Sequence, residues 1–211
     1  MKISYAITVC NEIEEIKKLI PFLLKHKRDE DEIVVQQDEI SKGDNKVLKV
    51  QNYLNDLIFS SKIKFVSKPL NNNFSEFKNN LNLHCTGDFI FQIDADEILT
   101  EQFITNLHSI LENNKDIEAY YVNRINTIEG ITREHIQRWG WNINSYGHIN
   151  WPDKQLRIYK NSPDIKWEGK VHETIKGYKT ISQFPDDLSW ALNHPKTIER
   201  QEKQNEYYDT L

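Results

Sequence analysis

The stretch that decides the fold is Gly87-Asp88-Phe89-Ile90-Phe91-Gln92-Ile93-Asp94-Ala95-Asp96-Glu97-Ile98-Leu99. Its apolar run, Phe89 to Ile93, is typical of a buried strand. Three carboxylates, Asp94, Asp96 and Glu97, follow where this strand should leave the sheet. Carboxylates near a core are costly unless they are paired or bind a metal, and oxygen ligands suit Mg²⁺ or Mn²⁺ completed by a substrate phosphate. The stretch therefore predicts either a metal and phosphate site or an acidic cap on the next helix.

Strand-like and helix-like segments alternate along the first half of the chain. The strand-like segments are 3–9, 32–37, 63–66 and 89–93, and the helical patterns are 13–24, 45–58, 74–81 and 103–111. This alternation predicts an α/β fold with a mostly parallel sheet sandwiched by helices. Ligands of such sheets bind at the carboxyl ends of the strands. Asn11, Glu12, Asp38 and the 94–97 group all fall at predicted strand ends.

The pattern changes after Asp116. Extended segments are expected at 119–128, 155–159 and 166–171, and a polar helix at 198–208. All five tryptophans lie in this second half. Trp167 and Trp190 are expected to pack in a core. Trp139 and Trp141 lie in a Gly- and Asn-rich stretch, where they either pack a small lobe or offer apolar ring faces to a sugar.

Composition excludes several classes of protein. The 211 residues carry a net charge of −5 with basic residues spread throughout, which argues against a nucleic-acid partner. No apolar stretch is long enough to span a membrane. Cys10 and Cys85 are expected to be small buried thiols without a disulfide framework. The apolar run at 3–9 is too short for a secretion signal, so a cytoplasmic location is expected, with peripheral membrane association left open.

Taken in order, several segments resemble the family 2 glycosyltransferases of GT-A fold. They are 7–12, Asp38, 74–79, 87–97, 153–157 and 167–173. The resemblance runs from Met1 to about Glu173 and points to bacterial-type enzymes that add a hexose to lipid-linked or surface glycans. It implies an inverting transferase with a nucleotide-sugar donor, most simply a UDP-sugar, a divalent metal (Mn or Mg), and a glycan or lipid-linked acceptor. A single GT-A domain, 1–211, would bind the nucleotide sugar with residues 1–128 and the acceptor with 129–211.

The resemblance also implies roles for individual residues. The implied donor-binding residues are Thr8, Asn11, Glu12, Asp38, Lys78, Asp94, Ala95, Asp96 and Arg157. Asp38 would accept a hydrogen bond from the base, and Lys78 would reach a phosphate unless it is simply a solvated helix lysine. Asp94 would contact the ribose or the metal, Asp96 would bind the metal, and His172 would add a metal or phosphate contact. Trp139 and Trp141 would contact the acceptor.

Inversion needs a base that takes the proton of the acceptor hydroxyl. Asp153 stands in the family's catalytic position, although Pro152 replaces the usual preceding Glu. Glu173 is the second candidate, and it could instead orient His172 or bind the acceptor. The choice between Asp153 and Glu173 stays open.

Three other functions compete with a transferase. A sugar nucleotidyltransferase would need a Gly-rich loop after the first strand, where this chain has Val9-Cys10-Asn11-Glu12. A phosphatase-like enzyme would place the Asp-x-Asp motif at the first strand, and here it follows the fourth. A nucleotide-sugar or glycan-binding module without turnover would keep the site residues, so only product formation separates it from an enzyme.

Overall fold

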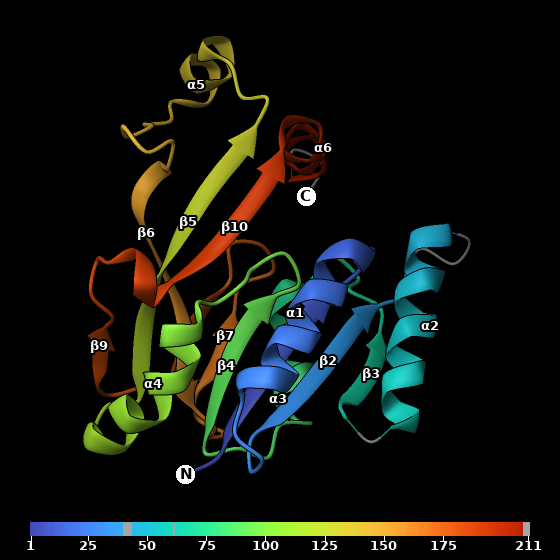
Figure 1. Ribbon diagram of the computed structural model, residues 1–211, viewed down its shortest axis with the longest axis vertical. Coiled ribbons are helices and arrows are strands. Elements are labelled where there is room, and N and C mark those ends of the chain that lie inside the picture. The colour runs from blue at the N-terminus through green and yellow to red at the C-terminus, as the bar shows by residue number, and fades with distance from the viewer. Residues whose placement is uncertain (40–43, 61, 209–211) are drawn as a thin grey trace.

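The computed structural model describes residues 1–39, 44–60 and 62–208 and has helices on both faces of a central sheet (Figure 1). The strands of this sheet are β1 Ile3–Val9, β2 Glu32–Asp38, β3 Lys64–Lys68, β4 Phe89–Asp94, β5 Ala119–Glu129, β6 Ile149–Lys160, β9 Ile181–Gln183 and β10 Ala191–Thr197. The helices are α1 Ile13–His26, α2 Asn45–Phe59, α3 Phe74–Asn82, α4 Glu101–Asn113, α5 Arg133–Trp139 and α6 Ile198–Tyr208. The sheet order is β10-β5-β6-β4-β1-β2-β3, with β9 paired to β5. The predicted α/β architecture is confirmed.

The first half of the chain forms the parallel part of the sheet, as predicted. β1 lies between β4 and β2 and runs parallel to both, so Thr8 is the register partner of Asp94 on one side and of Gln36 on the other. β3 continues the parallel run beside β2 and starts at Lys64, one residue later than expected. Because parallel strands end at the same edge, the polar residues after β1, β2 and β4 are neighbours in space.

Two apolar clusters hold the helices on the two faces of the sheet. One cluster contains Leu19 of α1, Leu54 of α2 and Phe103 of α4. The other contains Leu81 of α3 and Trp167, the latter in a separate two-stranded sheet formed by β7 Lys166–Glu168 and β8 Thr174–Lys176. The predicted packing roles of the tryptophans hold for Trp167, which is buried, and for Trp190, which packs against the first cluster.

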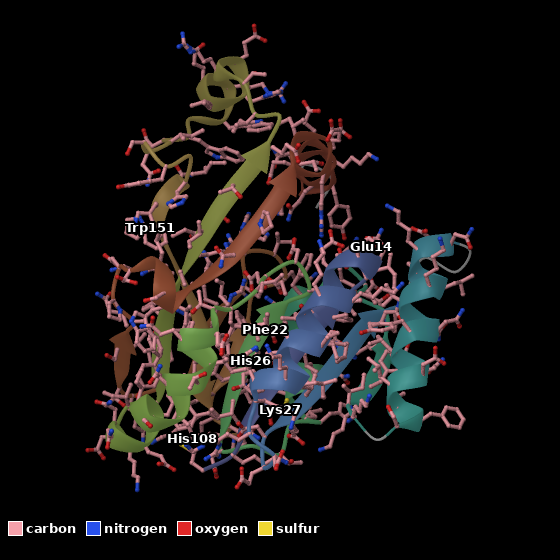
Figure 2. The ribbon with its side chains drawn as sticks, viewed as in Figure 1. Glu14, Phe22, His26, Lys27, His108 and Trp151 are labelled. Carbon is pink, nitrogen blue, oxygen red and sulfur yellow. The ribbon has the colours of Figure 1, made fainter. Side chains whose placement is uncertain are left out.

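Helix α1 directs its amino end toward the carboxyl edge of the sheet. Glu14 and Glu15 lie in its first turn and Lys25 and His26 in its last, and Figure 2 shows Glu14 and His26 at opposite ends of the helix. These charges complement the helix dipole. The positive end of the dipole therefore faces the edge where an anionic ligand would bind.

The second half of the chain departs from the prediction in extent and in pairing. β6 begins at residue 149, six residues before the predicted segment at 155–159, and lies antiparallel between β4 and β5. The expected strand at 166–171 is only β7, which pairs with β8 outside the main sheet. β10 was not predicted, because its single apolar pair, Ala191-Leu192, gives no period to detect. Strands from both halves thus share one sheet.

The stretch around Trp139 is more regular than expected. Trp139 is the last residue of α5, which Thr132 caps at its start and Gly140, in the left-handed region with φ 64°, ends. The rings of Trp139 and Trp141 lie 4.7 Å apart, and His135 stacks on Trp139 at 5.1 Å. Figure 1 places α5 beyond the ends of β5 and β10, away from the sheet's core.

Only one of the two cysteines is as buried as expected. Cys85 is buried and Cys10 is half-buried, and both are free thiols. None of the helices in the described ranges is long and apolar enough to cross a membrane. The predicted polar helix at 198–208 is α6.

Gly87 gives a stability test of the β1–β4 junction. A Cβ there would lie 2.6 Å from the Ser4 backbone nitrogen and 2.9 Å from the Ile3 carbonyl carbon, so β1 would have to shift. We expect Gly87→Ala to lower the free energy of unfolding by about 1–3 kcal/mol, the cost of overpacking, measured by urea denaturation. Gly140→Ala is the control, because its Cβ meets nothing within 4 Å and only the positive φ is strained. A smaller loss in Gly87→Ala than in Gly140→Ala would contradict the close approach.

Candidate active site

A buried arginine lies between two carboxylates at the end of β4. Arg157 Nη2 is 2.8 Å from Asp94 Oδ2 and 2.5 Å from Glu97 Oε1. Arg157 and Glu97 are 3% and 0% exposed, so water solvates neither charge. Arg124 Nη1 is 3.5 Å from the same Glu97 oxygen. Arg157, predicted to contact the donor, instead lies beneath the strand end with its guanidinium directed to these carboxylates.

The turn after β4 fixes the position of Asp94. The Asp94 N–H donates to Glu97 Oε2 at 3.0 Å, and the Glu97 N–H donates back to the Asp94 carbonyl at 2.9 Å. Thr8 Oγ1 donates to Asp94 Oδ1 at 2.8 Å, which confirms that the β1 and β4 ends meet. Burial alone would raise the pKa of Asp94, but Arg157 and Lys78 hold it well below its usual range. Asp94 is therefore an ionised and rigidly held carboxylate.

Asp96 contacts two basic side chains that the sequence did not point to. His194 Nε2 and Arg200 Nη2 each lie 3.2 Å from Asp96 Oδ2. Burial would raise the pKa of Asp96, but His194 and Arg200 lower it to about 2, so the carboxylate is ionised at neutral pH. His194 comes from β10 and Arg200 from α6, and a histidine and an arginine spaced six residues apart give no motif by which sequence could have found them.

Asp153 belongs to the same charged cluster. Its Oδ2 accepts hydrogen bonds from Arg124 Nε at 2.9 Å and from Asn126 Nδ2 at 2.7 Å, and its Oδ1 accepts from Gln155 at 2.6 Å. Burial would raise the pKa of Asp153, but Arg124 and these donors lower it. Asn126 Oδ1 is also 2.7 Å from His194 Nδ1, so one amide links Asp153 to the histidine beside Asp96.

Glu173, the second base candidate, is paired with Lys78. Lys78 Nζ lies 2.7 Å from Glu173 Oε1 and 4.4 Å from the centre of the Trp167 ring. Lys78 is only 6% exposed, so the alternative of a solvated helix lysine is wrong. Its expected contact with a phosphate would require it to leave Glu173. His172 precedes this pair with a positive φ of 55° and is exposed.

The residues predicted for the nucleoside pocket cluster at the ends of β1 and β2. Glu12 Oε2 accepts hydrogen bonds from the N–H groups of Cys10 and Asn11, at 2.7 and 3.0 Å. Glu12 Oε1 lies 3.1 Å from Arg200. Asp38 Oδ1 accepts from the Leu70 N–H at 3.0 Å and so ties the loop after β3 to the end of β2. Asn11 itself is exposed and available to a ligand.

The predicted metal ligands are not gathered into a protein-only metal site. Among the residues that the structure describes, no group of three or more His, Cys, Asp or Glu side chains could hold a metal, so His172 does not join Asp94 and Asp96 in this way. Mg²⁺ and Mn²⁺ need only one or two carboxylates when substrate phosphates complete their shell. Asp96, ionised and beside His194, fits that donor set, whereas both Asp94 oxygens already accept hydrogen bonds.

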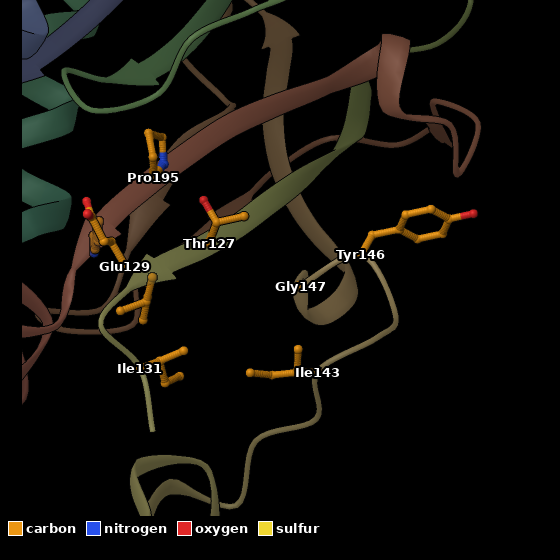
Figure 3. A pocket seen from close by; sticks show the side chains of 9 residues that line it. Thr127, Glu129, Ile131, Ile143, Tyr146, Gly147 and Pro195 are labelled. Carbon is orange, nitrogen blue, oxygen red and sulfur yellow. The ribbon is translucent and has the colours of Figure 1, made fainter. Parts of the chain in front are cut away.

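A cavity of about 510 Å³ lies in the second half of the chain (Figure 3). Its lining comprises Thr127, Ile128, Glu129, Ile131, Ile143, Tyr146, Gly147, Pro195 and Lys196. Tyr146 is 80% exposed, and neither Trp139 nor Trp141 lines the cavity. Thr127 and Pro195 are register partners that alternate with Asn126 and His194 along their strands. Ile128 and Lys196, which also line the cavity, are register partners on the same face of these strands as Asn126 and His194, because alternate strand residues share a face.

The sequence and the fold were compared with known proteins. Residues 4–186 match the family model described as Glycosyl transferase family 2. No curated protein matches the sequence significantly. The structure of S. aureus TarS 1-349 in complex with UDP-GlcNAc matches with a TM-score of 0.54 and 16% identity, covering 93% of this chain and 59% of that chain. The structure of the longer S. aureus TarS chain matches with a TM-score of 0.56 and 16% identity, covering 97% of this chain and 38% of that chain. At this identity the likeness shows the fold alone, and this chain spans less than two thirds of the TarS chains.

The buried ion pairs predict a large cost for removing Arg157. Arg157→Met leaves Asp94 and Glu97 without their shared cation, and we expect a loss of about 3–5 kcal/mol in unfolding free energy, the usual cost of breaking a buried pair. Arg138→Met is the matched control, because Arg138 is 63% exposed and its partner Glu202 lies 3.6 Å away, so its loss should stay below about 1 kcal/mol. Adding Glu97→Gln to Arg157→Met should recover part of the loss. Equal losses in the two single variants, measured by urea denaturation, would refute a buried charge cluster.

Proposed function

Because the chain belongs to glycosyl transferase family 2, we propose that it moves a hexose from a nucleotide sugar to a glycan or lipid-linked acceptor with inversion at the anomeric carbon. A UDP-linked donor is the first expectation, and the TarS structure with UDP-GlcNAc supports testing it first. The observation that carries the proposal is the pair of ionised carboxylates, Asp94 and Asp96, at the carboxyl end of β4. They lie at the sheet edge where doubly wound folds bind nucleotides.

The donor would bind across the ends of β1, β2 and β4. Thr8 supports Asp94, which is free to accept a ribose hydroxyl only if one of its present donors yields. Asn11 and Asp38 would contact the nucleoside, and the amino end of α1 adds a favourable dipole for the diphosphate. Asp96 and His194 would hold the divalent metal, in place of the predicted contribution from His172. When bound, the metal would neutralise the charge that develops on the diphosphate leaving group.

We favour Asp153 over Glu173 as the base. Asp153 is joined through Asn126 to His194, at 2.7 Å on each side of the amide, so it belongs to the cluster that includes Asp96. Asp153 is ionised at neutral pH, as a proton acceptor must be, although its lowered pKa makes it a weaker base. Glu173 is paired with Lys78 at 2.7 Å, as Asp153 is with Arg124 at 2.9 Å, and would serve better in positioning the 172–173 segment.

The acceptor would approach from the second half of the chain. Trp139 and Trp141 stay as predicted acceptor contacts, and their paired rings offer the flat apolar faces that suit a sugar. The exposed Tyr146 ring, stacked against His148 at 5.9 Å, offers another such face beside the cavity.

Loss of Asp96 tests the proposal directly. With UDP-glucose or UDP-galactose, Mn²⁺ and a panel of glycan acceptors, we expect Asp96→Asn to lower turnover by about two to three orders of magnitude, as loss of electrostatic stabilisation of a leaving group does. Turnover would be followed as UDP release, and EDTA should abolish it until Mn²⁺ is added back. Asp29→Asn, an exposed aspartate remote from the site, is the control. Full turnover in Asp96→Asn would refute the metal assignment, and UDP binding without transfer to any acceptor would favour a binding module.

Comparing Asp153→Asn with Glu173→Gln tests which residue is the base. We expect Asp153→Asn to lower turnover by about two to four orders of magnitude, because the proton acceptor is lost, with little change in donor affinity. Glu173→Gln should cost less, since Glu173 would position the 172–173 segment and take no proton. Turnover and the dissociation constant for UDP would be measured for both variants, with thermal unfolding to verify the fold. The reverse ranking would assign the base to Glu173.

A further inference from the structure

Helix α6 is held on the molecule by polar contacts. None of its described side chains, 198–207, is buried. Its charged contacts run to α1 through Arg200, to α5 through Glu202, and its Tyr207 hydroxyl donates to Asn72 at 2.8 Å, in the loop before α3. Elements with few buried apolar contacts open at low free energy. Figure 1 shows α6 beyond the end of β10, close to the amino end of α1.

Arg200 is the centre of these contacts. Its Nη2 lies 3.1 Å from Glu12 Oε1 and 3.2 Å from Asp96 Oδ2, and its Nη1 lies 2.8 Å from Glu15 Oε1. One guanidinium thus serves three carboxylates from α1 and from the turn after β4. Its side chain is still 32% exposed, so it can change partners without crossing a packed core.

The far end of α6 reaches the predicted nucleoside pocket, because the Tyr207 hydroxyl donates to Asn72 and the nearby Leu70 N–H donates to Asp38 at 3.0 Å. Burial raises the pKa of Tyr207, and the nearby charge of Asp38 raises it further. Asp38 ends β2 and was predicted to contact the base. From Arg200 to Tyr207, α6 therefore runs from the proposed metal carboxylate to the proposed base contact.

We propose that Arg200 is the cation that binds the donor's diphosphate, and that it exchanges Asp96 and Glu15 for phosphate oxygens when the nucleotide enters. The inference rests on the proposed function, because it needs a diphosphate at Asp96. A divalent cation on Asp96 repels the guanidinium that now contacts it, and the phosphates arriving with the cation offer Arg200 the planar, bidentate partner it prefers. Glu12 would keep Arg200 near the pocket during the exchange, so that α6 stays over the nucleotide. Before the nucleotide arrives, Arg200 offsets the repulsion among Glu12, Glu15 and Asp96.

This exchange predicts opposite shifts for two ligands in one variant. In Arg200→Gln, UDP binding in the presence of Mn²⁺ should weaken about ten- to a hundredfold, because a charge-assisted contact is lost. Mn²⁺ binding in the absence of nucleotide should become tighter, because Asp96 no longer has a competing cation. Arg200→Lys keeps the positive charge but loses the planar guanidinium that can bind a phosphate through two nitrogens. Its UDP affinity should lie between those of the wild type and Arg200→Gln. Calorimetry with UDP and with Mn²⁺ alone measures both quantities.

Glu202→Gln is the matched control. It removes the contacts from α6 to His135 and Arg138, at 3.4 and 3.6 Å, and so loosens the same helix without touching the proposed phosphate ligand. UDP affinity should stay within about twofold of the wild type, since exposed pairs contribute little. Equal UDP affinity in Arg200→Gln and the wild type, or equal weakening in Glu202→Gln and Arg200→Gln, would overturn the role of Arg200. If the wild type binds neither UDP nor GDP with Mn²⁺, the proposed function itself fails.

Discussion

The ion pairs of Arg157 with Asp94 and Glu97 hold the ligand-binding edge of the sheet in one arrangement. Arg157 and Glu97 are almost fully buried, so each is tolerated only while the other is present. The constraint explains why β6 must lie antiparallel beside β4, since that position brings Arg157 beneath the turn that carries Asp94. A sheet of the first four strands alone would leave Glu97 charged, buried and without an arginine.

Acidic residues of one half of the chain pair with basic residues of the other half throughout the charged cluster. The carboxylates Glu12, Asp94, Asp96 and Glu97 come from the first half of the chain. Their basic partners Arg124, Arg157, His194 and Arg200 come from four elements of the second half: β5, β6, β10 and α6. The two halves thus complement each other in charge at this edge. The division at residue 128 only separates the residues expected to bind the donor from those expected to bind the acceptor. It is not a domain boundary, because β5, β6 and β10 complete the sheet that the first half begins.

Sequence reasoning succeeded where one local pattern decides the outcome. The run from Phe89 to Ile93 predicted β4, and the helical pattern at 45–58 predicted α2, which Asp44 caps by accepting from the Lys46 N–H at 2.8 Å. The sequence did not predict the role of a residue where that role depends on a partner far away in the chain. The role of Arg157 depends on the antiparallel register of β6, and His194 depends on a strand with one apolar pair. Lys78 seemed equally suited to solvent or phosphate until Glu173 and Trp167, 95 and 89 residues away, enclosed it.

The two aspartates of one short motif differ in what their partners can do. Asp94 is held by the buried Arg157 and by Thr8 of the neighbouring strand. Replacing either partner would disturb the sheet itself. Asp96 is bound by Arg200, whose side chain is about a third exposed on a helix without buried side chains among those described. An ion pair open to solvent exchanges partners at a far lower cost than a buried one. Asp94 is thereby suited to hold the geometry of the strand end, and Asp96 to receive an incoming charge.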